Sequence, residues 1–171
     1  MQEFTNDPID INLLPQFQEV PLNGLSPKYW KIVVINMGIF IAVTTIGIIF
    51  LLLFNAEIKK YTGLIIGAYL FLMVLMFLLY RADVNRRGFA VREKDIIYRH
   101  GLIAISTTII PFSRIQHIAL DEGLFSRMYQ LGQLRIFTAG GNSGSLHIPG
   151  IEIEEARQIK ELLMRQISLQ D

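Results

Sequence analysis

The chain has 171 residues, of which 51% are hydrophobic and only 18% are charged, a balance that leans toward membrane proteins. It contains no cysteine, which excludes disulfides, thiolate metal sites and a cysteine nucleophile. The formal net charge of +1 gives no overall field that would attract nucleic acid. We therefore expect a membrane-associated protein that has no nucleic acid partner.

Two long uncharged runs lie in the first half of the chain. Residues 32–54 comprise 23 residues without a charge, and residues 62–80 comprise 19. Either run can cross a hydrocarbon core of about 30 Å as a helix. A signal peptide would need a basic start and a small-residue cleavage site, which are absent, and two buried soluble helices would need a larger body around them. Residues 28–80 are therefore predicted to form a two-span transmembrane hairpin.

The charges around the two runs predict the orientation of the hairpin. Only residues 55–61 separate the runs, so both outer ends must lie on one side of the membrane. The loop carries Lys59 and Lys60, whereas the outer ends carry more basic residues, namely Lys28, Lys31, Arg81, Arg86, Arg87 and Arg92. The positive-inside rule then predicts a multi-pass protein of the cell (inner) membrane with both termini in the cytoplasm. Residues 1–27, acidic and without Lys or Arg, would form an N-terminal cytoplasmic tail.

Two features within the spans are open to more than one interpretation. Asn36 could bond to another helix, or it could be a polar residue tolerated near the membrane surface. Gly63 and Gly67 form a G-x-x-x-G pattern, which permits close helix approach but also arises by chance in membrane helices.

From Gly88 onward the pattern changes to short alternating strands. The strands are predicted at residues 88–91, 96–101, 105–111, 114–120, 134–140 and 145–150. Within the fourth, Ile118 and Leu120 are expected on one face and His117 and Ala119 on the other. A short helix around Leu124–Met128 interrupts the strands, residues 140–144 (GGNSG) predict a hairpin turn, and Pro149-Gly150 is expected to stop the sheet.

The last predicted element is an amphipathic helix that begins at Glu152. Its apolar residues recur at three- and four-residue spacing, at Ala156, Ile159, Leu163 and Ile167, with Leu162 beside them. Acidic residues in the first turn suit the positive end of the helix dipole. We expect this helix to plug one open end of a strongly bent sheet.

Five stretches, in order along the chain, carry a resemblance to a known family. They are residues 88–92 (GFAVR), 111–118 (PFSRIQHI), 124–131 (LFSRMYQL), 137–140 (FTAG) and 148–151 (IPGI), preceded by residues 25–31 (LSPKYWK). On these motifs the chain resembles the bacterial pleckstrin-homology (PH) domain membrane proteins of the YdbS-like type. The resemblance departs at residues 128–130, which affects packing only, and it implies no defined activity.

The resemblance completes the expected architecture, which is of the α+β class. It implies that residues 81–171 form a cytoplasmic PH-like domain, a seven-stranded bent β-sheet or barrel capped by the C-terminal amphipathic helix. The transmembrane hairpin (28–80) would precede that domain. The family is sometimes accompanied by a larger relative that carries several such domains.

The residues give little support to catalysis or to a cofactor. His100, His117 and His147 have no metal-ligand spacing, and a structural hydrogen bond is the expected role of His117. Ser113 lacks a nucleophile elbow, and the glycines of residues 140–144 lack the P-loop pattern. Asp121 and Glu122 are adjacent and would point to opposite sides of a strand. We therefore expect a protein that is not an enzyme and needs no metal or cofactor.

Two functional hypotheses follow, and both place the domain at the membrane surface. The first is a protein-interaction or scaffold subunit, whose partner is a larger multi-domain PH-like membrane protein or a second copy of the chain. Its candidate residues are Gln116, His117, Arg127 and Arg135. The alternative is a sensor of anionic lipid headgroups in the bilayer. Its candidates are the basic residues near the spans, Arg81, Arg86, Arg87, Arg92, Lys94 and Arg99, which could instead only fix topology.

Overall fold

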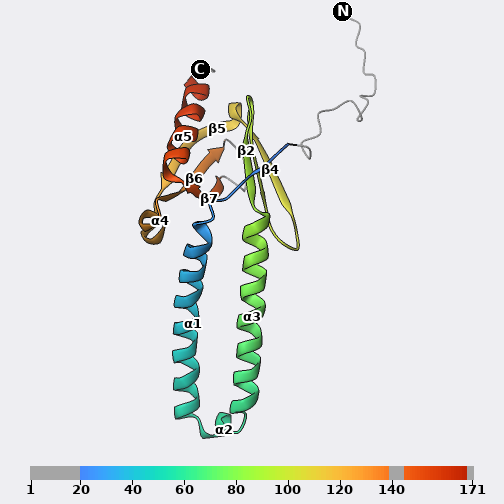
Figure 1. The fold of residues 1–171 in the computed structure, drawn as a ribbon, viewed down its shortest axis with the longest axis vertical. Helices are drawn as coiled ribbons and strands as arrows, with labels where there is room; N and C mark the ends of the chain where they lie inside the picture. The colour runs from blue at the N-terminus through green and yellow to red at the C-terminus, as the bar shows by residue number, and fades with distance from the viewer. Residues whose placement is uncertain (1–19, 139–144, 169–171) are drawn as a thin grey trace, which may run out of the picture.

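Two long helices run side by side and end at a β-rich domain in the computed structural model, which describes residues 20–138 and 145–168 (Figure 1). Helix α1 spans Tyr29–Phe54 and helix α3 spans Thr62–Arg86, with the short helix α2 (Ala56–Lys59) between them. Both long helices are apolar enough to cross a membrane, with mean hydropathies of 2.7 and 2.5. The two predicted apolar helices are thus confirmed, and α3 continues beyond residue 80 through Arg81 and Asp83.

A polar clasp and an aromatic contact join the two long helices. The hydroxyl of Tyr69 on α3 lies 2.9 Å from the hydroxyl of Thr44 and 2.8 Å from that of Thr45 on α1. Trp30 meets Phe77 edge to face, with ring centroids 5.4 Å apart. Gly63 and Gly67 have open space where a Cβ would stand, so the G-x-x-x-G pattern does not mediate the packing of α1 on α3.

The domain consists of two antiparallel sheets. Strands β1 (Asn23–Gly24), β2 (Gly88–Val91), β3 (Asp95–His100) and β4 (Ser106–Pro111) form the first sheet in chain order. A 3-10 turn, η3 (Phe112–Arg114), leads into the second sheet, formed by β5 (Ile115–Asp121), β6 (Leu131–Thr138) and β7 (Ser145–Glu152). Helix α4 (Leu124–Met128) joins β5 to β6, and α5 (Ile153–Ser168) follows β7.

The hairpin is inserted between two neighbouring strands of one sheet. Strand β1 precedes α1, and β2 follows α3, yet Asn23 pairs with Phe89 and Gly24 with Gly88. Residues 23 and 24, within the segment expected to be a tail, therefore form part of the sheet. Because β1 leads into α1 and α3 leads into β2, this pairing fixes the domain ends of both long helices at the same edge of the sheet.

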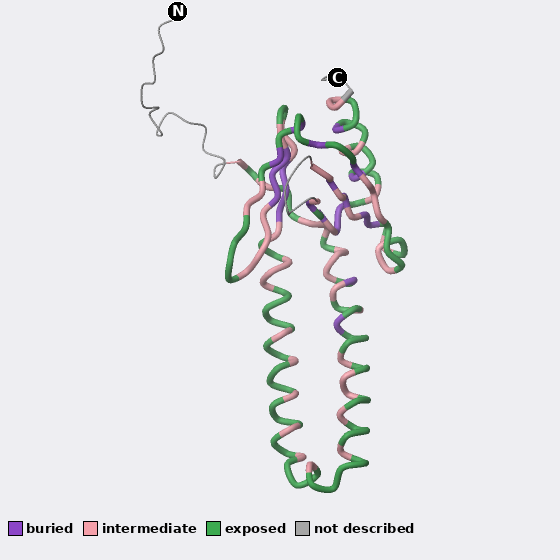
Figure 2. Tube along the Cα trace, turned by 180° about the vertical axis from the view of Figure 1, so that it is seen from behind, coloured by how far each residue is buried: buried purple, intermediate pink, exposed green. Residues whose placement is uncertain are grey.

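One hydrophobic core lies between the two sheets and α5 (Figure 2). The first sheet contributes Ile96 and Tyr98, the second contributes Leu134 and Ile148, and all four are almost fully buried. Ala156 and Leu163 of α5 are fully buried against them, which confirms that the amphipathic C-terminal helix caps the sheets.

Two local predictions have different outcomes. The expectation that Pro149-Gly150 stops the sheet is wrong, because β7 continues to Glu152. An edge strand tolerates proline, since one side of the strand needs no ladder hydrogen bond. In β5, Ile118 is buried and His117 is exposed, as the alternation predicts. The predicted turn at residues 140–144 lies outside the described residues.

Candidate functional site

The hairpin is fastened to the domain around Gly150 of β7. The backbone N–H of Ser26 donates to the carbonyl of Gly150 at 2.9 Å. Gly150 has a φ of +70°, and a Cβ at this position would lie 2.5 Å from Cγ of Tyr29. Lys28 Nζ lies 3.0 Å from a carboxylate oxygen of Glu152. We call this set of contacts the junction; it places the first turn of α1 directly against the domain.

The end of α3 is held by a partly buried ion pair. Arg87 Nε donates to Asp83 Oδ2 at 2.9 Å. Burial is the largest influence on Arg87 and lowers its pKa, but the hydrogen bond with Asp83 and the neighbouring Tyr98 and Asp83 outweigh it, so the pKa lies above its ordinary value. Burial raises the pKa of the nearby Tyr98. The arginine is therefore charged and the phenol neutral at neutral pH.

The six basic candidates do not form one cluster. Arg81 stacks over the ring of Trp30, and Arg86 Nη1 donates to the carbonyl of Leu102 at 3.3 Å. Arg87 and Arg99 also lie near the hairpin, because Arg87 follows α3 and Arg99 on β3 pairs with Gly88 at the start of β2. Because β2 leads away from α3, the β2–β3 turn with Arg92 and Lys94 lies at the far end of the domain (Figure 1).

Most of these basic side chains have partners within the chain. Arg87 pairs with Asp83 and Arg92 with Asp95, whose Oδ1 lies 2.6 Å from Arg92 Nε. The Nε of Arg99 is buried, without a hydrogen-bond partner among the described residues. Lys94 is exposed. Four of the six basic candidates, Arg81, Arg86, Arg87 and Arg92, therefore contact other residues of the chain itself.

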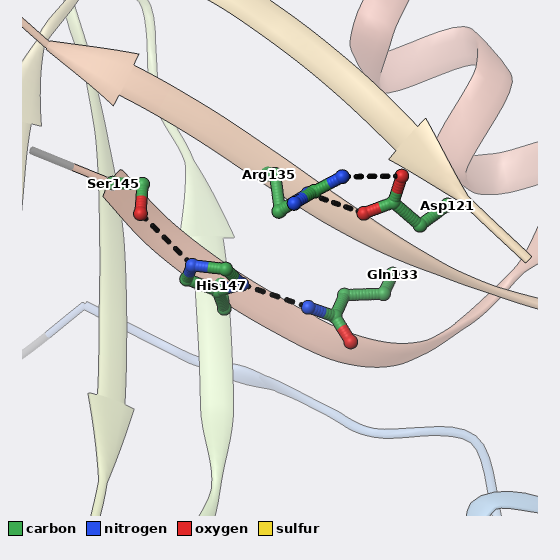
Figure 3. Close-up of polar contacts among 5 residues, drawn as sticks. All are labelled: Asp121, Gln133, Arg135, Ser145 and His147. Atoms are coloured by element: carbon green, nitrogen blue, oxygen red, sulfur yellow. Dashed lines mark hydrogen bonds and ion pairs between the residues drawn. The ribbon is translucent and has the colours of Figure 1, made fainter. Parts of the chain in front are cut away.

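The outer face of the second sheet carries two separate groups of polar contacts, one between β5 and β6 and one between β6 and β7 (Figure 3). Arg135 on β6 donates to Asp121 Oδ1 on β5 at 2.8 Å. On β7, His147 Nε2 lies 2.9 Å from the hydroxyl of Ser145, and its Nδ1 lies 2.8 Å from the amide nitrogen of Gln133. The contacts with Ser145 and Gln133 fix the orientation of His147, which sequence reasoning did not select as a site residue.

Two of the four interaction candidates meet on that face. His117 stacks against Phe137, with ring centroids 5.6 Å apart, and Arg135 lies over the same ring. Gln116 is exposed beside His117 on β5. Arg127 is exposed on α4 and does not lie on the outer face of the second sheet.

A corner pocket of about 410 Å³ opens where the start of β7 faces β3 and β4. Its polar lining comprises Arg87, Tyr98, His100, Thr108, Ser145 and His147. Because Arg87 follows the last turn of α3, the pocket lies at the membrane-proximal end of the domain.

A larger groove of about 710 Å³ runs between β2 and α5. We call it the α5 groove; its lining includes Val91 from β2, Glu93 from the β2–β3 turn, and Glu155, Ile159 and Leu162 from α5. Leu162 is 45% exposed although it is a large apolar residue. Sequence reasoning did not identify the groove, although Leu162 widens the apolar stripe of α5 beyond what one buried face requires.

The described residues contain no cluster of potential metal ligands. No three His, Asp or Glu side chains among them gather closely enough to hold an ion. His100 and His147 line the corner pocket, while His117 stacks on Phe137.

The architecture is that of a PH-like domain with a membrane hairpin attached: a four-stranded and a three-stranded antiparallel sheet, closed by a C-terminal helix. Comparison with known sequences agrees. The sequence model of the bacterial PH domain family matches residues 31–167, and the chain belongs to that family. No solved structure matches the chain.

Two similar proteins come from Bacillus subtilis (strain 168). The chain is 25% identical over 156 residues to the UPF0699 transmembrane protein YdbS, an alignment that covers 86% of this chain and 94% of that protein. It is 28% identical over 114 residues to the UPF0699 transmembrane protein YdbT, covering 65% of this chain but only 22% of that protein. Both are named transmembrane proteins, in accord with the two apolar helices of this membrane protein.

Proposed function

We propose that this bacterial PH domain protein is a membrane-anchored interaction subunit that binds another protein at the cytoplasmic face of the membrane, and that it is not an enzyme. The α5 groove carries the proposal, because it joins an incompletely paired strand edge to exposed apolar side chains. The partner that we propose is a larger membrane protein of the same family, which would place an extended segment in the groove.

Part of the β2 edge has no strand partner within the described residues. Strand β1 pairs with Gly88 and Phe89 only, so on this side Ala90 and Val91 have no partner strand within the described residues. An extended peptide can pair with such an edge through its backbone, and neighbouring pockets then select alternate side chains. The groove runs along this edge, with Val91 on one side and Leu162 on the other.

The lining of the groove defines the chemistry of its occupant. Ile159 and Leu162 offer apolar contacts, and Leu162 is the more exposed of the two. Glu93 and Glu155 are exposed carboxylates at the groove, and the nearby Arg92 is already paired with Asp95. The matching segment is therefore extended, with apolar residues at alternate positions and at least one basic residue.

The comparisons support a larger relative as the partner. Bacillus subtilis encodes both similar proteins: the alignment covers 94% of YdbS but only 22% of YdbT, so YdbT is much longer than this chain. A hairpin anchor confines two such proteins to one thin layer, which raises the effective concentration of each for the other.

Co-purification with substitutions in the groove tests the proposal. The tagged full-length protein is gently solubilised from its native membrane, and stoichiometric companions are identified by mass spectrometry. Leu162→Gln should reduce recovery of a larger bacterial PH domain protein at least several-fold. Met164→Gln, an exposed apolar position on α5 outside the groove lining, is the matched control and should leave recovery unchanged. Recovery of the chain alone, of self-oligomers only, or equal loss in both variants contradicts the proposal.

A second candidate, recognition of anionic headgroups, is supported by the corner pocket rather than by the full set of basic residues. Arg87, His100 and His147 line it at the membrane-proximal end of the domain, with hydroxyl donors from Thr108 and Ser145. We expect His100→Ala/His147→Ala to lower the anionic share of the lipid that co-purifies with the protein. An unchanged lipid composition argues against this second function.

A further inference from the structure

Two exposed apolar protrusions flank the hairpin where it meets the domain. The first is the β3–β4 turn, in which Ile103 is 93% exposed and Ile105 is 60% exposed. The second is helix α4, in which Leu124 is 77% exposed and Met128 is 72% exposed. Large apolar side chains gathered on a protruding surface indicate contact with another apolar phase or partner.

Both protrusions are tied to the hairpin ends that lie next to the domain. The β3–β4 turn is held beside α3, because Arg86 Nη1 donates to the carbonyl of Leu102 at 3.3 Å. Helix α4 is held beside α1, because Lys31 Nζ lies 5.8 Å from the centre of the Tyr129 ring. Figures 1 and 2 show the turn beside the upper end of α3 and α4 beside the upper end of α1.

The turn is built to present its apolar tip. Gly101 has a φ of +99°, and a Cβ there would lie 2.1 Å from the carbonyl oxygen of Ala104. Only glycine fits such a closely approached, left-handed position. Within this tight turn Ile103 is almost fully exposed.

Helix α4 shows the complementary pattern of an interfacial segment. Leu124 and Met128 lie four positions apart, and the exposed Arg127 lies on the same side of the helix. Apolar side chains with an adjacent cation are the composition of segments that lie in the headgroup layer of a bilayer. Arg127, a candidate for protein contact by sequence, is thus placed for contact with lipid phosphate.

We propose that the β3–β4 turn and α4 dip into the interfacial layer of the bilayer on either side of the hairpin and seat the domain against the membrane. The occupant is lipid, because the uncharged runs of the hairpin end at Lys31 and Arg81, and Arg86 lies only about 7.5 Å further along α3, at the level of the headgroups. A domain seated at two points cannot swing freely about its anchor. The α5 groove and the corner pocket therefore keep a fixed height and orientation above the membrane surface.

The absence of cysteine makes this inference directly measurable. Single-cysteine variants Ile103→Cys and Met128→Cys are labelled with an environment-sensitive fluorophore and reconstituted as full-length protein. The vesicles contain phosphatidylcholine and phosphatidylglycerol, with or without nitroxide-labelled lipid. Glu161→Cys on the exposed side of α5 is the control. Nitroxide lipid should quench the labels at positions 103 and 128 several-fold more strongly than the label at position 161. Equal quenching at all three positions overturns the proposal.

A charge placed on one protrusion provides a second readout. In protein carrying Ile105→Asp, quenching of the label at position 103 should fall, and thermal unfolding of the domain should stay unchanged because Ile105 lies outside the core. Ser106→Asp, at the exposed start of β4, is the matched control. A different result overturns the lipid assignment: labels that are unquenched in vesicles but inaccessible to reagents in native membranes mean that a protein covers these residues.

Discussion

The hairpin and the domain are held together by different forces. In α1 only Ile32 and Met37 are buried, and α3 buries no residue, whereas the two sheets and α5 enclose one continuous core. The large exposed side chains of α1 and α3 gain their stabilisation from lipid, not from each other. The folding of the domain therefore depends on its own packing, and the placement of the hairpin depends on the bilayer.

The junction connects the lipid-stabilised hairpin to the domain, which is stabilised by its own core. Because β1 and β2 are neighbours in one sheet and the hairpin lies between them in sequence, both helix ends are fixed to the same sheet edge. Tyr29 against Gly150 and Arg87 with Asp83 add side-chain contacts at the two ends. Substitutions in the core, the junction and the hairpin should accordingly have effects of decreasing size.

The largest contrast is expected between a core residue and a lipid-facing one. Leu163→Ala removes a fully buried side chain and should lower the unfolding free energy of the domain by about 2–5 kcal/mol, because a cavity adds to the lost transfer energy. Leu53→Ala acts on a residue that is 72% exposed and should change it by less than about 0.5 kcal/mol. Thermal unfolding in detergent micelles measures both. Equal effects would show that the domain has no independent core.

A substitution at the junction should have an intermediate effect. Gly150→Ala forces a side chain into a left-handed position and against Tyr29, at an expected loss of roughly 1–3 kcal/mol. Gly24→Ala, where a Cβ meets nothing within 4 Å, is the matched control. Tyr29→Gly should partly rescue Gly150→Ala, because it removes the Cβ, Cγ and Cδ2 atoms of residue 29 that the new Cβ would meet at 2.5–2.8 Å. No rescue in the Gly150→Ala/Tyr29→Gly double variant would mean that backbone strain, not contact with residue 29, is responsible.

The elements that could be predicted from sequence are those with a local periodic signal. The two apolar runs, the alternating β5 and the amphipathic α5 each carry their pattern within a few adjacent residues. Strand β1 has only two residues, and its partner lies beyond the whole hairpin, so no local pattern reveals it. Pro149-Gly150 looked like a stop because the sequence does not reveal that β7 is an edge strand or that its register with β6 shifts at these two residues.

The candidate sites show the same limit. Sequence proximity grouped Arg81, Arg87 and Arg92, but a strand rises about 3.3 Å per residue, and β2 carries Arg92 away from the membrane end. The α5 groove and the corner pocket combine residues that are remote in sequence, such as Arg87 with His147. Neither could be assembled without the register of the sheets.

Within the hairpin, the polar clasp should contribute a small amount. Tyr69→Phe removes the hydroxyl that contacts Thr44 and Thr45, and hydrogen bonds between membrane helices average about 0.6 kcal/mol. Pairs of spin labels on α1 and α3 should report a broader distance distribution in vesicles. Tyr61→Phe, at the loop end of α3, is the control and should leave the distribution unchanged. An unaltered distribution in Tyr69→Phe would show that the junction and the loop alone hold the helices together.

The smallest expected effect is a pH dependence at the junction. The hydrogen bond from Lys28, the charge of Lys28 and the hydroxyl of Ser26 lower the pKa of Glu152 below its ordinary value of 4.5. A carboxyl group with a lowered folded-state pKa stabilises the fold above its unfolded-state pKa, and this contribution disappears as the pH falls through the folded-state value. Glu152→Gln should therefore unfold at a slightly lower temperature than the parent protein at pH 7. The two unfolding temperatures should converge as the pH falls below the lowered pKa of Glu152. Added salt should reduce their difference at pH 7, because the pair is exposed. A difference that persists at low pH and in high salt would assign the effect to packing rather than to charge.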